Sequence, residues 1–217
     1  MNQIFITGGS KGLGKEIIKR IKSNNNQIIN LSRSKSNIKD IKNIIFDLNK
    51  INTIESFLKK NITIKKNKFK SLILNSAYGY DDIVTNLEIK NLQKMININL
   101  IANMIIVKFF IRKAILNKTK LSIVFISSIS TKTGYKGLSM YAASKGGLEA
   151  FSKNIAREWG KFGIRVNSIA PTKIVSENNK ILNSKKRLNL IKKKIPLNQF
   201  TKKEDIAEIC YFLTSSA

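Results

Sequence analysis

The sequence contains no histidine and only one cysteine, Cys210. A single cysteine cannot form a disulfide within the chain, and the lack of histidine excludes the usual zinc sites and imidazole-based catalysis. Cys210 lies in the apolar pattern IAEICYFL, which is typical of a core position. Any catalysis by this chain must therefore depend on other side chains.

Proline is also scarce, with two residues in 217, and no Pro-rich or Ser-rich linker and no internal repeat divides the chain. The hydrophobic residues make up 42% of the sequence. This length and composition suit one globular domain and are marginal for two. We therefore predict a single domain over residues 1–217.

Long uncharged apolar runs are absent. The most apolar stretch, ININLIANMIIV, is followed by Lys108, Arg112 and Lys113, so we do not expect a transmembrane helix. The N-terminus, MNQIFITGG, lacks the basic start, long apolar centre and cleavage site of a secretory signal, and it indicates a first strand. A cytoplasmic location is the corresponding expectation.

Acidic residues are few, because 13 Asp and Glu stand against 40 Lys and Arg, a net charge of +27. One interpretation is a partner with many negative charges, such as nucleic acid, an anionic membrane or an acidic carrier protein. The other is compositional drift in an A- and T-rich genome, since Lys, Asn and Ile are all abundant. The basic residues are scattered and do not alternate with aromatics, so nucleic acid is not the expected partner.

Short apolar segments alternate with longer amphipathic ones from the start of the chain. Such alternation implies right-handed crossovers and a parallel sheet covered on both faces. The predicted fold class is therefore a doubly wound α/β domain. The predicted strands are residues 3–8, 27–32, 43–48, 71–76, 121–127 and 164–170.

A basic, helix-like insertion, SENNKILNSKKRLNLIKKKIP, spans residues 176–196 after the last predicted strand. Ligands of open α/β sheets bind beyond the carboxyl ends of the strands, so this insertion is placed to act as a lid. A solvated amphipathic helix is the alternative.

A glycine-rich turn, TGGSKGLGKEI, follows the first predicted strand and contains Gly8, Gly9, Gly12 and Gly14. A strand, a glycine-rich turn and an amphipathic helix together form a diphosphate site, because glycine lets the backbone approach and the helix amides meet the negative charge. The turn therefore predicts a dinucleotide-binding site.

The end of the second predicted strand indicates which dinucleotide. A site for NAD usually carries an acid there for the ribose 2′-hydroxyl. Here the sequence is LSRS, with Ser32 and Arg33 at that point, and Lys11 in the glycine turn adds a second cation. Two cations without an acid suit a 2′-phosphate, so we predict NADP as the cofactor.

Tyr141 and Lys145 lie four residues apart in SMYAASKGGL, on one face of a predicted helix. A free tyrosine has a pKa of about 10, and a neighbouring ammonium favours the phenolate and lowers that pKa. The pair is a candidate general acid and base. Ser127 and Ser128 end the preceding strand, where a hydroxyl can hydrogen-bond a substrate oxygen.

Together these motifs resemble the short-chain dehydrogenase/reductase family. TGGSKGLG is similar to the family's T-G-x-x-x-G-x-G turn, YAASK is similar to its Y-x-x-x-K motif, and the spacing from Ser128 to Tyr141 fits its catalytic serine. The motifs follow the family's order across nearly the whole chain. The resemblance is closest to the single-domain ketone and 3-oxoacyl reductases and implies a Rossmann-like domain.

The resemblance also implies the residues of the active site. Asn99 in MININL is similar to an asparagine that supports a water-linked proton relay. The implied catalytic set is Ser128, Tyr141, Lys145 and Asn99, working without a metal.

The implied cofactor site extends over much of the chain. Asp47 would reach the adenine, the backbone at Ile174 would hold the nicotinamide amide, and Ser176 would hold a phosphate. The full implied set is Gly8, Ser10, Lys11, Gly12, Leu13, Gly14, Arg33, Asp47, Leu48, Asn75, Tyr141, Lys145, Ile174 and Ser176.

Three features depart from the family pattern. Tyr78 replaces the last glycine of N-N-A-G, and Thr172 stands where the family's proline-glycine segment has glycine. The sequence also stops at LTSSA, so we expect either that the family's usual last strand is lacking or that the sequence is a shortened form. The resemblance implies a dimer or tetramer through the helices that contain Asn99 and Tyr141.

The leading hypothesis is reversible hydride transfer between NADP(H) and a carbonyl or secondary alcohol. A second hypothesis is a non-catalytic cofactor-binding regulator or scaffold with the same fold. The departures favour the second, and the intact Ser, Tyr, Lys and Asn set argues against it. The substrate stays open between a 3-oxoacyl group on an acidic carrier protein and a nucleotide-linked or polysaccharide sugar.

Overall fold

Parallel strands form the centre of the molecule. The computed structural model describes residues 1–23, 25–65, 68–174 and 185–215, and within them the sheet has six strands in the order β3-β2-β1-β4-β5-β6. All of its strand pairs are parallel. The strands are β1 (Asn2–Thr7), β2 (Asn26–Ser32), β3 (Lys42–Ile45), β4 (Phe69–Leu74), β5 (Leu121–Ile126) and β6 (Ile164–Ile169).

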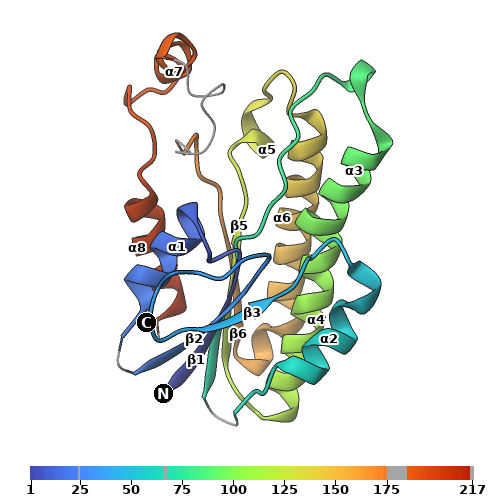
Figure 1. The fold of residues 1–217 in the computed structure, drawn as a ribbon, viewed down its shortest axis with the longest axis vertical. Coiled ribbons are helices and arrows are strands. Elements are labelled where there is room, and N and C mark those ends of the chain that lie inside the picture. The colour runs from blue at the N-terminus through green and yellow to red at the C-terminus, as the bar shows by residue number, and fades with distance from the viewer. Residues whose placement is uncertain (24, 66–67, 175–184, 216–217) are drawn as a thin grey trace.

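Helices cover both faces of this sheet, with α1 and α8 on one side and α2, α3, α4 and α6 on the other (Figure 1). The predicted doubly wound fold is therefore confirmed. The α-helices of the described residues are α1 (Gly12–Ile21), α2 (Ile54–Asn61), α3 (Ile89–Ile96), α4 (Ala102–Leu116), α5 (Ser130–Thr133), α6 (Ser139–Trp159), α7 (Lys185–Lys192) and α8 (Lys203–Thr214).

Burial on both faces explains the sequence of the strands. Every residue of β5 is buried, and so are the last five of β1. A strand with no solvent face reads as a continuous apolar run rather than an alternating one. Each predicted strand is found near its predicted place, although β3 ends at Ile45, before the predicted 48, and the edge strands β3 and β6 are partly exposed.

Each face of the sheet has its own core. On one face the side chains of α1 pack with α8, where Cys210 is fully buried, as predicted. On the other face an aromatic cluster surrounds Phe110 of α4, whose ring centroid lies 4.7 Å from those of Phe5 and Phe69 and 5.2 Å from that of Phe109. These aromatic contacts join α4 to the centre of the sheet.

The longest apolar helix belongs to this second core. Residues Ile89–Leu116 run through α3, a π-helical turn (Asn97–Ile101) and α4. By length and composition this stretch could cross a membrane, with a mean hydropathy of 1.5, but 56% of its apolar window is buried inside the protein. It is a core helix of the fold, and its burial agrees with the expectation of no membrane span.

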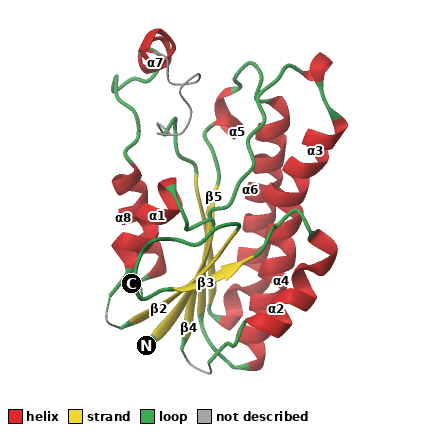
Figure 2. Cartoon of the chain, viewed as in Figure 1, coloured by secondary structure: helices red, strands yellow, loops and turns green. Residues whose placement is uncertain are grey.

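The basic insertion is only partly described. Residues 175–184 lie outside the described chain, whereas α7 stands at the end of the molecule where α5 also lies (Figure 2). A hydrogen bond between the hydroxyls of Thr172 and Thr201 joins the two flanks of this region. The lid function stays a prediction. Among the described residues no strand follows β6.

Replacing Phe110 with alanine should lower the free energy of unfolding by about 3–5 kcal/mol, because the ring is fully buried among three other rings. Urea unfolding measures this change. Leu116→Ala is the matched control on the same helix, since Leu116 is 77% exposed, and it should cost less than about 1 kcal/mol. Similar losses in both variants would contradict the role of the aromatic cluster.

Candidate active site and cofactor cleft

The strand order reverses between β1 and β4. From β1 the chain builds outward to β3, and it then returns to the other side of β1 to begin β4. Open α/β sheets bind ligands at such a point, beyond the carboxyl ends of the strands. A cleft of about 520 Å³ lies there, lined by the glycine turn after β1, residues 32–34 at the end of β2, 46–48 after β3 and 75–78 after β4.

The glycine turn forms the floor of this cleft. Gly8 has a φ of +71°, a left-handed conformation that favours glycine. A Cβ on Gly14 would lie 2.2 Å from the Gly8 carbonyl oxygen, so no side chain fits between the turn and α1. The first turn of α1 contains no acidic residue, and Lys11 at its N-cap makes no side-chain capping bond. Its amides therefore face an anion site.

Polar contacts between β1 and β4 hold the turn in place. The Thr7 hydroxyl accepts hydrogen bonds from the backbone amides of Asn75 and Ser76, both at 3.0 Å. The side-chain amide of Asn75 donates to the carbonyls of Thr7 (3.2 Å) and Gly8 (3.1 Å). Asn75 lines the cleft, and its amide group also fixes the shape of the glycine turn.

The two predicted cations lie at one part of the cleft. Arg33 and Lys11 both line it and are both exposed. The hydroxyl of Ser34 donates to that of Ser10 at 3.1 Å, which joins the segment after β2 to the glycine turn. The structure therefore brings together the cationic residues on which the NADP prediction depends.

Asp47 and Leu48 line another part of the cleft, beside Phe46. One carboxylate oxygen of Asp47 accepts the backbone amide of Asn49 at 3.0 Å, which orients the side chain. Phe46 packs on Phe57 with ring centroids 4.2 Å apart. This part of the cleft offers a flat apolar surface next to an acid.

Ser128 follows β5 with its hydroxyl oxygen already occupied as an acceptor. It accepts hydrogen bonds from the backbone amide of Ser130 at 3.2 Å and from the hydroxyl of Ser130 at 3.0 Å. A serine hydroxyl has two lone pairs and one proton. With both lone pairs engaged, the proton of Ser128 is free to be donated outward, which suits a substrate oxygen.

Tyr141 and Lys145 occupy the first turns of α6. Lys145 is 2% exposed, and its ammonium donates to the carbonyl of Ile126 at 2.7 Å. The same ammonium lies 5.8 Å from the centroid of the Tyr141 ring. Tyr141 and Lys145 therefore lie close together on one face of α6, as their spacing predicts.

The expected lowering of the Tyr141 pKa is wrong for this structure. Burial raises the pKa of Tyr141 to about 12, and the charge of Asp81 adds to the increase. Burial also lowers the pKa of Lys145 to about 8. Desolvation therefore outweighs the attraction of the ammonium, and near neutral pH the tyrosine is protonated while the lysine is still mostly charged.

Asn99 sits in the π-helical turn and is fully buried. Its amide donates to the Tyr78 carbonyl and to the Ser144 hydroxyl, both at 3.0 Å, and its oxygen accepts the Tyr78 amide at 2.8 Å. Such π-helical turns are frequent at functional sites. Asn99 thus joins the cleft loop after β4 to helix α6, which carries Tyr141.

A family model for short chain dehydrogenases matches residues 2–187 of this chain. The chain belongs to the short-chain dehydrogenase family. The prediction of the family, and with it that of an oxidoreductase, is confirmed at this level.

Named relatives agree with this assignment. The 3-oxoacyl-[acyl-carrier-protein] reductase FabG of Buchnera aphidicola subsp. Acyrthosiphon pisum is 33% identical over 219 residues, covering 97% of this chain and 88% of the relative. A short chain dehydrogenase family protein from Francisella tularensis has a TM-score of 0.86 at 27% identity, covering 100% and 92% of the two chains. ElxO with NADP bound, at 23% identity and 99% and 92% coverage, shares the fold with a TM-score of 0.86.

Not every predicted residue of this short-chain dehydrogenase lines the cleft. Gly12, Leu13 and Gly14 shape the start of α1 without being part of the lining. Ile174 borders a second hollow of about 290 Å³ beside Phe200 and residues 201–204. Ser176 lies outside the described residues.

The four catalytic candidates come from three segments: Ser128 after β5, Asn99 in the π-helical turn, and Tyr141 with Lys145 on α6. Among the described residues that line the cleft, none is a catalytic candidate, but Asn99 connects the candidates to the cleft through Tyr78. Tyr78, one of the departures from the family pattern, lines the cleft and donates its hydroxyl to Asn91 at 2.9 Å. A second departure, Thr172, is hydrogen-bonded to Thr201 through the two hydroxyls. The side chains of Tyr78 and Thr172 therefore both make hydrogen bonds that a glycine could not make.

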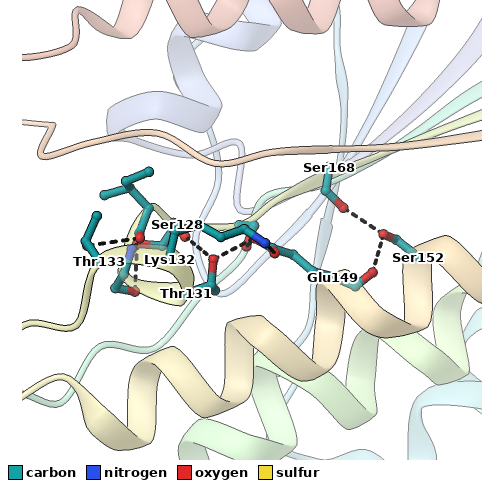
Figure 3. A network of polar contacts seen from close by, with 10 residues as sticks. Ser128, Thr131, Lys132, Thr133, Glu149, Ser152 and Ser168 are labelled. Carbon is teal, nitrogen blue, oxygen red and sulfur yellow. Dashed lines mark hydrogen bonds and ion pairs between the residues drawn. The ribbon is translucent and has the colours of Figure 1, made fainter.

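Sequence reasoning missed several residues of the site. Phe46, Ser76 and Ala77 line the cleft. Phe46 lies near the end of the predicted strand 43–48, Ser76 ends the predicted strand 71–76 and Ala77 follows it, and this position at strand ends is the signal that could have identified them. Glu149 was also missed, although it lies four residues after Lys145 and so on the same helix face. Its carboxylate bonds to the segment around Ser128 (Figure 3).

Proposed function

We propose that this short-chain dehydrogenase uses NADPH to reduce a carbonyl group to a secondary alcohol. The observation that carries the proposal is a pair of hydroxyl donors on neighbouring elements. Ser128 has both lone pairs engaged, so that its proton is available, and burial together with Asp81 keeps Tyr141 protonated. Two such donors suit a carbonyl oxygen that gains negative charge as it is reduced.

The cleft fits NADP by the chemistry of its residues. The amides at the start of α1 suit the diphosphate, and Arg33 and Lys11 suit the 2′-phosphate. Asp47 and the apolar surface beside it suit the adenosine. When bound, NADPH supplies the hydride for the reaction. A likeness of 23% to a protein with bound NADP shows the fold alone, so the preference for NADP depends on the two cations.

The remaining residues of the set orient the donors and supply charge. Lys145, protonated below a pKa of about 8, places a positive charge beneath Tyr141 and favours transfer of the tyrosine proton to the substrate oxygen. Asn99 ties the cleft loop to α6 through Tyr78 and Ser144. Cofactor and proton donor are thus held by one network.

We further propose a 3-oxoacyl group on a carrier protein as the substrate. The name of the Buchnera relative specifies this substrate for that protein. The net charge of +27 gives this chain a strong attraction for an acidic partner. A cytoplasmic location and a dimer or tetramer through α4 and α6 belong to the same proposal.

The main experiment is NADPH and NADH oxidation by the purified protein with ketones, 3-oxoacyl thioesters and keto-sugars. Turnover that prefers NADPH supports the proposal, and preference for the thioesters supports the carrier-linked substrate. Tight NADPH binding without turnover on any carbonyl would favour the regulator or scaffold hypothesis.

Arg33→Ala should weaken NADPH binding by about tenfold or more and leave NADH binding nearly unchanged, because only NADPH has the 2′-phosphate. Titration of the two cofactors by fluorescence measures both affinities. Lys35→Ala is the control, since Lys35 is exposed two residues further on and does not line the cleft. Equal weakening of both cofactors in Arg33→Ala contradicts the assigned contact.

Tyr141→Phe should reduce turnover by about 10²–10⁴-fold, the usual contribution of a positioned acid, without changing the affinity for NADPH. Steady-state rates and cofactor titration check the two parts. Tyr211→Phe, on α8 at the other face of the sheet, removes an exposed tyrosine hydroxyl and should keep the wild-type rate. Retained turnover in Tyr141→Phe would refute the role of Tyr141.

The rate of carbonyl reduction should fall above a pH of about 8. Burial disfavours the charged form of Lys145 and lowers its pKa to that value, so its ammonium is present below it and lost above it. The pH dependence of kcat/KM measures this limb. Lys145→Met should abolish it, whereas Lys153→Met, an exposed lysine of the same helix, should retain it. A rate that is level across this pH contradicts the prediction.

A further inference from the structure

Glu149 is a buried carboxylate on α6, two helical turns beyond Tyr141, and it is only 8% exposed. One of its oxygens accepts hydrogen bonds from the hydroxyls of Ser127 at 2.6 Å and Thr131 at 3.0 Å. The other oxygen lies 3.3 Å from the ammonium of Lys132. Ser127 precedes Ser128 in the sequence, and Thr131 and Lys132 follow it, so Glu149 contacts the chain on both sides of the serine. Figure 3 shows Glu149 with Thr131 and Lys132.

Other contacts fix the same segment to the sheet rather than to α6. The backbone amide of Ser127 donates to the Ile169 carbonyl at 2.7 Å, and that of Ile129 donates to the Pro171 carbonyl at 3.0 Å. These bonds set the position of Ser128 relative to β6. The Glu149 carboxylate sets its position relative to the helix that carries Tyr141.

Glu149 is itself anchored at its backbone. The hydroxyl of Ser152 donates to the Glu149 carbonyl at 2.8 Å, and the hydroxyl of Ser168 in β6 donates to that of Ser152 at 2.9 Å (Figure 3). The polar network therefore runs from β6 through α6 to the segment after β5. This network connects β6, α6 and the segment after β5 that contains Ser128.

Burial of the Glu149 carboxylate carries a desolvation cost that its hydrogen bonds offset. Burial raises the pKa of Glu149, but hydrogen bonds from Ser127, Thr131 and Lys132 outweigh it and hold the pKa below its usual value. An apolar residue of similar volume often stabilises a buried site as well as a charged one does. The charge therefore contributes directed hydrogen bonds, which an apolar side chain cannot make.

We propose that Glu149 is a positioning residue that holds the Ser128 hydroxyl in register with Tyr141 during carbonyl reduction, an inference that rests on the proposed function. Glu149 does not touch the substrate in this proposal. It acts through Ser127 and Thr131, which flank the serine.

Glu149→Gln tests the proposal with the least change of shape. If the amide oxygen keeps the bonds from Ser127 and Thr131, its NH2 group faces the Lys132 ammonium, which is also a donor, and the reverse orientation loses both hydroxyl bonds, so the segment should shift. Misplacement by about 1 Å can cost about 10²-fold in rate, and we expect kcat to fall by about 10–100-fold with an unchanged affinity for NADPH. Glu158→Gln, an exposed glutamate of the same helix, should keep the wild-type kcat. Equal kcat in the two variants overturns the proposal.

A double-mutant cycle with Ser128→Ala separates positioning from general destabilisation. If Glu149 acts through Ser128, the double variant Ser128→Ala with Glu149→Gln should be no slower than Ser128→Ala alone. Independent losses that multiply in the double variant overturn the proposal. Unfolding in urea monitors stability in the same set of variants.

Hydrogen exchange provides a readout that does not require turnover. In Glu149→Gln the backbone amides of residues 127–133 should exchange faster, while the rest of α6 is unchanged. Thr131→Val, which removes one donor and keeps the shape, should have a smaller effect in the same direction. Faster exchange supports the positioning contact even if the wild-type protein reduces no carbonyl, an outcome that refutes only the proposed function. Unchanged exchange overturns the inference.

Discussion

The close junction of β1 and β4 is the constraint on which the rest of the site depends. Thr7 is fully buried, and its hydroxyl accepts the amides of Asn75 and Ser76 across the junction. The backbone there is so crowded that a Cβ on Gly8 would lie 2.8 Å from the Ser76 hydroxyl. Because the side chains are absent, the turn can bend sharply at Gly8 and lead directly into α1. The glycine turn can therefore pack closely against the segment after β4 and still line the cleft at Gly8.

A series of hydrogen bonds connects this junction to the proposed catalytic residues. The loop after β4 continues to Tyr78, which Asn99 binds at both its amide and its carbonyl. Asn99 in turn binds Ser144 of α6, one residue before Lys145. Cofactor cleft and proton donor are therefore parts of one hydrogen-bonded structure, and a shift in one would reach the other.

Helix α6 carries charge into the core on the face that meets β5 and β6. Lys145 and Glu149 are both buried, and each is satisfied by the strand-end segments: Lys145 by the Ile126 carbonyl, Glu149 by hydroxyls on either side of Ser128. Buried charges are tolerated when they are paired or hydrogen-bonded in this way. The same burial sets the protonation states, since it raises the pKa of Tyr141 and lowers that of Lys145.

The sequence by itself determined the elements and their local chemistry. Continuous apolar strands, the glycine turn and the spacing of Tyr141 and Lys145 depend on near neighbours along the chain, and each is where it was predicted. Only the tertiary structure decided the increase in the Tyr141 pKa, the hydrogen bond between Thr172 and Thr201 and the contact of Glu149 with Ser127. These depend on burial and on segments far apart in sequence, such as Asp81 beside Tyr141. Local periodicity carries no information on such contacts, because desolvation and side-chain partners are set by the packing of distant elements.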